Sequence, residues 1–159
     1  MDPIIKQLQK NSKLSTSELA DLLARDEKEI VEQIATFEKE GAILGYQAVV
    51  DPEKAGDSGV TALIEVKLTP ERGGGFDRLA SRISKFDSVT SCYLMSGGYD
   101  LAVVVTGGNL RDVASFVTEK LSTIEGVIST ATHFQLKIYK QSGFFAQTES
   151  EPTRLAVAP

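Results

Sequence analysis

The chain has 159 residues, of which 42% are hydrophobic and 25% charged, and its formal net charge is −5. This composition is typical of a globular protein with one ordinary domain or two small ones. No apolar run approaches the ~20 residues that span a bilayer, and the first residues lack the basic start and apolar core of a secretion signal. We therefore expect a cytoplasmic protein without a membrane segment. Cys92 is the only cysteine, which excludes an intrachain disulfide and makes a cysteine-based zinc site unexpected.

Residues 1–50 predict three short helices followed by a strand. Ser15 and Glu18 have the spacing of a capping box, which favours the start of a second helix at this point. Asp26 offers the same kind of start for a third helix, whose apolar residues recur at helical spacing. Residues 42–50 are expected to form a β-strand. Three compact helices and a strand are typical of a winged helix-turn-helix domain.

Residues 51–59 are polar and contain proline and glycine, so we predict a linker there. Residues 60–140 then alternate between strand and helix patterns in the order βαββαβ. The expected elements are strands at 60–68, 89–95, 101–106 and 127–139, and helices at 76–86 and 110–124.

This order predicts a ferredoxin-like α+β domain in which two helices cover one face of an antiparallel sheet. The third strand, residues 101–106, is an apolar run that ends in a threonine, and it suits a central position. The other face of the sheet needs a partner, so we expect dimerisation through it. Residues 141–159 are predicted to be a polar C-terminal tail, although Phe144 and Phe145 leave a packed or exchanged segment open.

Four stretches in this order and spacing resemble the Lrp/AsnC (feast/famine) family of bacterial and archaeal transcription regulators. They correspond to the first helix of the helix-turn-helix, the exit from the recognition helix, a turn of the sensing domain and the exit from its second helix. They are Leu14-Ser15-Thr16-Ser17-Glu18-Leu19-Ala20, Phe37 to Tyr46, Gly98-Tyr99-Asp100, and Lys120 to Val127 with Thr130-Ala131-Thr132.

The resemblance covers residues 3–140 and implies a DNA-binding regulator rather than an enzyme. Its C-terminal domain, called the RAM domain in this family, is expected to bind a small effector, usually an amino acid, and no cofactor. The resemblance also implies dimers that commonly assemble to octamers, with the effector bound between dimers.

The expected recognition helix, residues 26–40, departs from the family pattern because it contains six acids and only two bases. DNA affinity depends mainly on lysine and arginine at phosphates, so this charge should weaken binding. Two interpretations stay open: a regulator that contacts double-stranded DNA, or a paralogue that binds DNA poorly and senses a metabolite or modulates a partner regulator. The candidate DNA contacts are Lys13, Lys28 and Gln33, with Lys6 and Lys10 as further lysines.

An amino acid effector needs acceptors for its ammonium and donors for its carboxylate. Two adjacent glycines in a turn can present backbone N–H groups to a carboxylate, and a nearby aspartate can pair with the ammonium. The resemblance implies that this turn and the last strand line the effector cleft. The candidate effector residues are Ser96, Gly97, Gly98, Tyr99, Asp100, Thr130 and Thr132. The alternative is a glycine hairpin whose aspartate binds only its own turn.

A remote enzymatic alternative is a relative of the sirohaem decarboxylases, which share this architecture. Such a site needs several cationic and imidazole groups, whereas the chain has one histidine. Strand alternation places His133 on the face opposite Thr132, where a surface role is expected. We expect Cys92 to pack within its strand rather than react. A purely structural or interaction role is the third possibility, and it predicts no stabilisation by small molecules.

Overall fold

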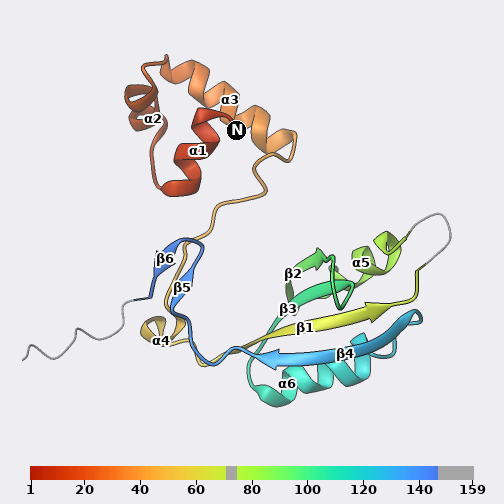
Figure 1. The fold of residues 1–159 in the computed structure, drawn as a ribbon. Coiled ribbons are helices and arrows are strands. Elements are labelled where there is room, and N and C mark those ends of the chain that lie inside the picture. The colour runs from red at the N-terminus through yellow and green to blue at the C-terminus, as the bar shows by residue number, and fades with distance from the viewer. Residues whose placement is uncertain (71–74, 147–159) are drawn as a thin grey trace, which may run out of the picture. The chain divides into compact units, whose positions relative to one another are not determined.

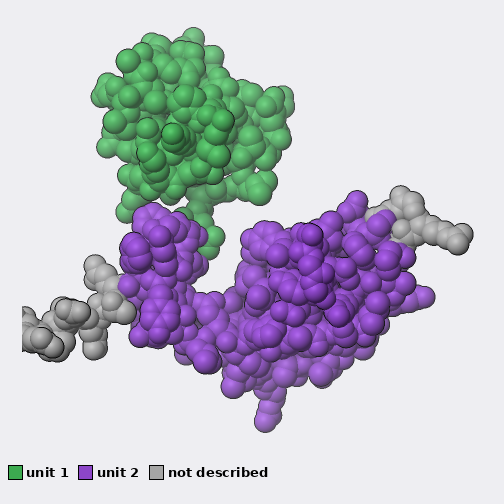
Figure 2. Space-filling view, viewed as in Figure 1, with its two compact units in different colours: residues 1–49 green, residues 50–159 purple. Residues whose placement is uncertain are grey.

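The computed structural model describes residues 1–70 and 75–146 (Figure 1). The chain divides into two compact units, an N-terminal unit of residues 1–49 and a C-terminal unit of residues 50–159 (Figure 2). In the described part of the chain, no helix combines the length and apolar character needed to cross a membrane.

The N-terminal unit consists of three helices: α1 (Pro3–Lys10), α2 (Thr16–Leu23) and α3 (Glu27–Lys39). Side chains cap all three, with Asp2 preceding α1, Ser15 forming the predicted capping box with Glu18 at α2, and Asp26 preceding α3. These caps satisfy backbone N–H groups that the first turn of a helix leaves without partners. Each helix contributes one fully buried residue to a common core, namely Ile4, Leu19 and Ile30.

The prediction of a strand over residues 42–50 is wrong. The backbone leaves α3 through hydrogen bonds from the N–H groups of Ala42 and Ile43 to the carbonyl of Phe37, and residues 44–50 then belong to no helix or strand. A strand needs a neighbour for its backbone hydrogen bonds, and this segment pairs with no other segment of the described chain.

The C-terminal unit contains a four-stranded antiparallel sheet, with two helical segments between its strands (Figure 1). Its elements are α4 (Pro52–Ala55), β1 (Val60–Leu68), α5 (Asp77–Ile83), β2 (Val89–Leu94), β3 (Leu101–Gly107), α6 (Leu110–Ser115), the π-helix η1 (Phe116–Leu121), β4 (Val127–Phe134), β5 (Lys140–Gln141) and β6 (Phe144–Phe145).

The strand order β2-β3-β1-β4 confirms the ferredoxin-like α+β fold and the central position of β3. Alternate residues of β1, including Ile64 and Val66, are fully buried and pair with buried residues of β3. This face packs against the two helical segments, where the rings of Phe86 and Phe116 meet edge to face with their centroids 5.3 Å apart. Cys92 packs against the same core, as expected.

Two predicted elements of this unit differ from the structure. The helix expected over 110–124 changes to a π-helix at Phe116, where the N–H of Ser122 donates to the carbonyl of Val117, five residues earlier. Phe116, Val117 and Leu121 of this segment are all buried in the core. The last strand ends at Phe134 rather than residue 139. Its ladder with β1 closes with the pair of Phe134 and Ala62 and one hydrogen bond from the N–H of Gln135 to the carbonyl of Thr61, and because β1 begins at Val60, residues 137–139 have no β1 residue opposite them.

The polar tail expected from residue 141 onward instead begins with a short hairpin, β5–β6. The rest of that predicted tail, residues 147–159, lies outside the described residues. The predicted linker 51–59 also contains the one-turn helix α4, which Asp51 caps.

Candidate functional site

The turn between α2 and α3 has the geometry of a helix-turn-helix. Ala24 adopts a left-handed conformation with φ 51°, and three residues join the two helices. The hydroxyl of Thr16 donates to Oε1 of Glu27 over 2.6 Å, which connects the starts of the two helices. Arg25, the only arginine of this unit, forms an ion pair with Glu29.

One face of α3 is exposed along its whole length. Ile30 is buried and Ile34 and Phe37 are half-buried, so the side chains on the opposite face point outward. These exposed residues follow the spacing i, i+3, i+4, i+7 and i+11. We call them the α3 stripe: Lys28, Val31, Glu32, Ala35 and Lys39.

Most acids of residues 26–40 flank the α3 stripe and have partners within the unit. Asp26 caps the helix, Glu27 accepts from Thr16, Glu29 pairs with Arg25, and Glu38 accepts from Tyr46. Within the α3 stripe the only carboxylate is that of Glu32, beside the two lysines. These carboxylates lie on both sides of the α3 stripe, so they would repel the phosphates of any duplex that received this helix in a groove.

The three predicted DNA contacts differ in their exposure to solvent. Lys28 is exposed on the α3 stripe, and Lys13 is exposed in the turn before α2, where its N–H donates to Asn11. Gln33 is half-buried beside the core-facing residues. Val31 and Ala35 were missed by sequence reasoning, although their spacing from buried Ile30 identifies them as exposed.

The candidate effector turn, residues 96–99, joins β2 to β3. The N–H of Met95 donates to the carbonyl of Asp100 over 2.8 Å and closes this loop. Gly97 has φ 151°, a conformation that favours glycine, whereas Gly98 has neither a positive φ nor any atom within 4 Å of an added Cβ. Among the described residues, the backbone N–H groups of Gly97 and Gly98 have no hydrogen-bond acceptor, so both remain available as donors.

Asp100 anchors this turn to β1. Its Oδ2 accepts from the N–H of Leu68 over 2.7 Å, and its own N–H donates to the carbonyl of Val66 over 3.0 Å. The carboxylate therefore contacts β1 rather than its own turn, which the hairpin alternative expected, and one of its oxygens is occupied. An ammonium group could use the other oxygen without breaking the anchor.

Thr130 and Thr132 lie on the helix-covered face of β4, opposite Val66 and Ile64 of β1. Thr130 also approaches the hydroxyl of Ser122 at 3.4 Å. The strand β1 lies between β4 and the candidate turn, and neighbouring strands are ~4.8 Å apart. One copy of the chain therefore brings the two threonines near the anchor of the turn but does not enclose a pocket between them.

The open face of the sheet carries small and apolar side chains together with the polar side chains of Glu65, Lys67 and His133. Leu63, Val104 and Tyr93 are partly or largely exposed on it. His133 is on this face, opposite Thr132 as predicted, with its Nε2 3.4 Å from Oε1 of Glu65. No group of three or more potential metal ligands occurs in the part of the chain that the structure describes.

Comparisons with known proteins agree with these two units. A family model described as the Lrp/AsnC ligand binding domain matches residues 61–144. The HTH-type transcriptional regulator YugG of Bacillus subtilis is 45% identical over 157 residues, which cover 98% of this chain and 95% of that protein. The HTH-type transcriptional regulator FL11 of Pyrococcus furiosus is 30% identical over 139 residues, which cover 87% of this chain and 89% of that protein.

Solved structures show the same fold. A transcriptional regulator of Neisseria meningitidis in complex with L-Met aligns with a TM-score of 0.67 at 24% identity, covering 97% of both chains. AsnC of E. coli aligns with a TM-score of 0.62 at 22% identity, covering 87% of this chain and 91% of that one.

Proposed function

Because the chain belongs to the Lrp/AsnC family of transcription regulators, we propose that residues 1–50 contact promoter DNA and residues 60–140 bind an amino acid. Regulation then operates by binding rather than catalysis. We place the protein in the cytoplasm, where the chromosome of a bacterium or archaeon lies. The observation that carries the effector assignment is the β2–β3 turn, whose two glycine N–H groups have no acceptor among the described residues.

The chemistry of this turn suits an α-amino acid. The N–H groups of Gly97 and Gly98 can donate to its carboxylate, and Oδ1 of Asp100 can accept from its ammonium. Tyr99 is half-buried beside them and offers an aromatic wall. A relative with the same fold is described in complex with L-Met, which makes an apolar amino acid the first ligand to test.

A second copy of the chain completes the pocket in this proposal. The open sheet face, with Leu63 and Tyr93 exposed, supports a dimer in which each sheet covers the other. Further association of dimers, up to an octamer, would place the turns of one dimer against the last strands of another. Ser96, Thr130 and Thr132 would then contribute hydroxyl groups to the same ligand.

For DNA, the α3 stripe is the surface that enters the major groove. Lys28 and Lys39 can reach phosphates, while Val31 and Ala35 offer apolar contacts to thymine methyl groups. Lys13 provides a further cation before α2. The carboxylates that flank α3 support a second candidate function, in which the chain binds DNA weakly and modulates a partner regulator by mixed assembly.

A thermal-shift screen of the full-length protein against the standard amino acids, beginning with L-Met, tests the effector site. We expect at least one amino acid to raise the melting temperature of the wild type, as binding to the folded state requires. Gly98→Ala should abolish this shift. It should leave the melting temperature without ligand unchanged, because an added Cβ at this position meets no atom within 4 Å. Gly45→Ala, also in open space, is the matched control.

The effector assignment fails if no amino acid shifts the wild type, or if Gly98→Ala responds like Gly45→Ala. A fluorescence titration with duplex DNA from upstream of the protein's own gene, in low salt, tests the DNA assignment separately. Tight binding excludes the second candidate function, and absence of binding favours it.

A further inference from the structure

The segment that follows β4 carries positive charge and exposed aromatic rings. We call residues 135–145 the C-terminal arm. It continues from β4 through a hydrogen bond from the N–H of Gln135 to the carbonyl of Thr61, and it ends in the β5–β6 hairpin (Figure 1). The arm contains two lysines and no acidic residue.

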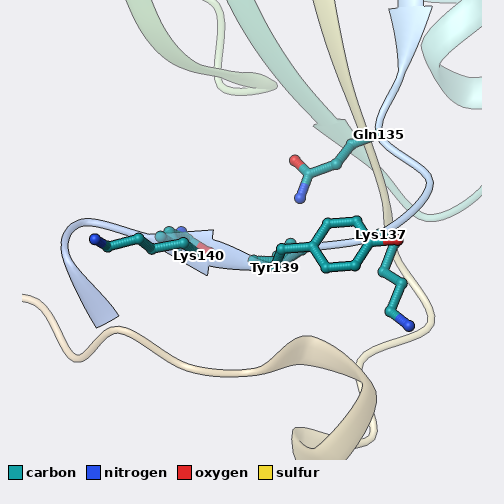
Figure 3. Close-up of a pocket in the computed structure, with 6 residues that line it drawn as sticks. Gln135, Lys137, Tyr139 and Lys140 are labelled. Carbon is teal, nitrogen blue, oxygen red and sulfur yellow. The ribbon is translucent and has the colours of Figure 1, made fainter. Parts of the chain in front are cut away.

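Residues Gln135 and Lys137 to Gln141 line an open groove of about 540 Å³ (Figure 3). Lys137 and Lys140 extend from opposite ends of this stretch, with the ring of Tyr139 between them. No carboxylate lines the groove, and two glutamines, Gln135 and Gln141, add amide donors to its lining.

The ammonium groups of both lysines lie close to aromatic rings. The Nζ of Lys137 lies 5.2 Å from the ring centroid of Tyr139, and that of Lys140 lies 4.5 Å from the ring centroid of Phe145. Cation–π contacts of this kind restrict a long side chain without neutralising its charge. Both rings are themselves largely exposed, with 67% of Tyr139 and 76% of Phe145 accessible to solvent.

The acidic character of the rest of the chain indicates what this positively charged arm could bind. The chain carries a net charge of −5, and carboxylates flank the α3 stripe on both sides. A protein that binds DNA must nevertheless present lysine or arginine to several phosphates. A groove with two cations, amide donors and no carboxylate is complementary in charge to a phosphodiester backbone, which carries one negative charge per phosphate.

We propose that the C-terminal arm is a second DNA-binding site, in which Lys137 and Lys140 contact the phosphate backbone of duplex DNA. This inference rests on the proposed DNA-binding function of the chain. The arm contributes affinity that does not depend on base sequence, because its cations bind phosphates rather than base edges. The arm supplies contacts to phosphates. At α3, the surrounding carboxylates disfavour such contacts.

The test compares full-length wild type with Lys137→Gln/Lys140→Gln by fluorescence anisotropy. The probes are a labelled duplex from upstream of the gene and a duplex of scrambled sequence, each titrated over a series of salt concentrations. Lys85→Gln/Lys120→Gln makes the same charge change at two other lysines of the C-terminal unit and serves as the control. Light scattering on all three proteins records their oligomeric state.

We expect the arm variant to bind both duplexes roughly tenfold or more weakly than the control variant in low salt. The slope of log affinity against log salt should fall by about 2, close to one for each lost phosphate contact. Inorganic phosphate at matched ionic strength should not displace the duplex.

Several results would overturn the proposal. If wild type binds DNA and the arm variant matches the control, the arm inference alone fails, whereas a wild type that binds neither duplex removes the DNA-binding function as well. A changed oligomeric state in the arm variant assigns the arm to an interface between copies instead. Specific displacement by inorganic phosphate identifies a site for a free anion.

Discussion

The hydroxyl of Tyr46 donates a hydrogen bond to Oε1 of Glu38 over 2.9 Å, which joins the extended segment after α3 to the last turns of that helix. The contact explains an acid that the helix dipole does not favour, since Glu38 lies near the C-terminal end of α3. Partial burial, followed by the hydrogen bond and charge of Glu38, raises the pKa of the Tyr46 phenol.

Glu38→Ala should therefore lower the pKa of Tyr46 but leave it raised, because burial is the larger cause. An ultraviolet titration of tyrosinate measures this, and Tyr46→Phe identifies the relevant step among the four tyrosines. The folded state favours the protonated phenol, so the stability from this group is present below the unfolded pKa of about 10 and is lost as pH rises through the folded value. Superimposable curves for wild type and Glu38→Ala would contradict the assignment.

The capping box of α2 makes a pH-dependent contribution of the opposite sign. The N–H and hydroxyl of Ser15 donate to Oε2 of Glu18 over 2.7 and 2.9 Å, and these bonds lower the pKa of Glu18 from its ordinary value of 4.5. Its stabilisation is therefore present above pH 4.5 and is lost as pH falls through the folded value.

Glu18→Gln keeps an oxygen acceptor but removes this titration. Circular dichroism melts over the acid range should show the melting temperature of wild type falling more steeply than that of Glu18→Gln. Ser15→Ala should lower the melting temperature at neutral pH, where Ser17→Ala on the same exposed turn serves as the control. Equal acid dependence in wild type and Glu18→Gln would show that the side-chain half of the box contributes nothing.

Glu32 is the carboxylate within the α3 stripe, so in the proposed DNA complex it should limit affinity most directly. Glu32→Arg replaces a repulsive charge with an attractive one at the centre of the stripe and should strengthen binding to upstream DNA by roughly tenfold in low salt. Glu53→Arg makes the same charge change on α4 and should have a smaller effect. If Glu32→Arg binds no better than wild type, the electrostatic objection to this helix is incorrect.

The fold was predictable from sequence where local signals and burial agree. Ser15 and Glu18 marked the start of α2, and the alternation of β1 identified Ile64 and Val66 as core residues. The prediction failed where the formation of a strand depends on a neighbouring strand. Residues 42–50 have a strand-like pattern without a partner strand, and residues 137–139 lie beyond the start of β1, where β4 has no partner.

The candidate site was predictable in composition but not in geometry. The glycines of the turn pointed to exposed N–H groups, and these are available in the structure. The sequence could not show that one oxygen of Asp100 is already bound by Leu68, a contact across 32 positions of the chain. Nor could it show that Glu27, Glu29 and Glu38 have partners within the N-terminal unit, since these depend on how the helices pack.

Gly126 lies at the tight turn between η1 and β4, with φ 97°, where an added Cβ would come within 2.8 Å of Cδ1 of Leu79. Leu79 is fully buried, and the carbonyl of Gly126 accepts from the N–H of Thr69 over 2.8 Å. Gly126→Ala therefore combines an unfavourable backbone conformation with a clash in the core, and should destabilise the C-terminal unit by roughly 1–3 kcal/mol.

Urea unfolding followed by circular dichroism measures this cost, with Gly98→Ala as the control because its added methyl meets no neighbour. Gly126→Ala/Leu79→Val should recover part of the lost stability if the clash dominates, because the shorter side chain makes room for the methyl. No recovery would assign the cost to the backbone conformation instead. A Gly126→Ala protein as stable as Gly98→Ala would show that the turn relaxes freely and that this close approach does not constrain the fold.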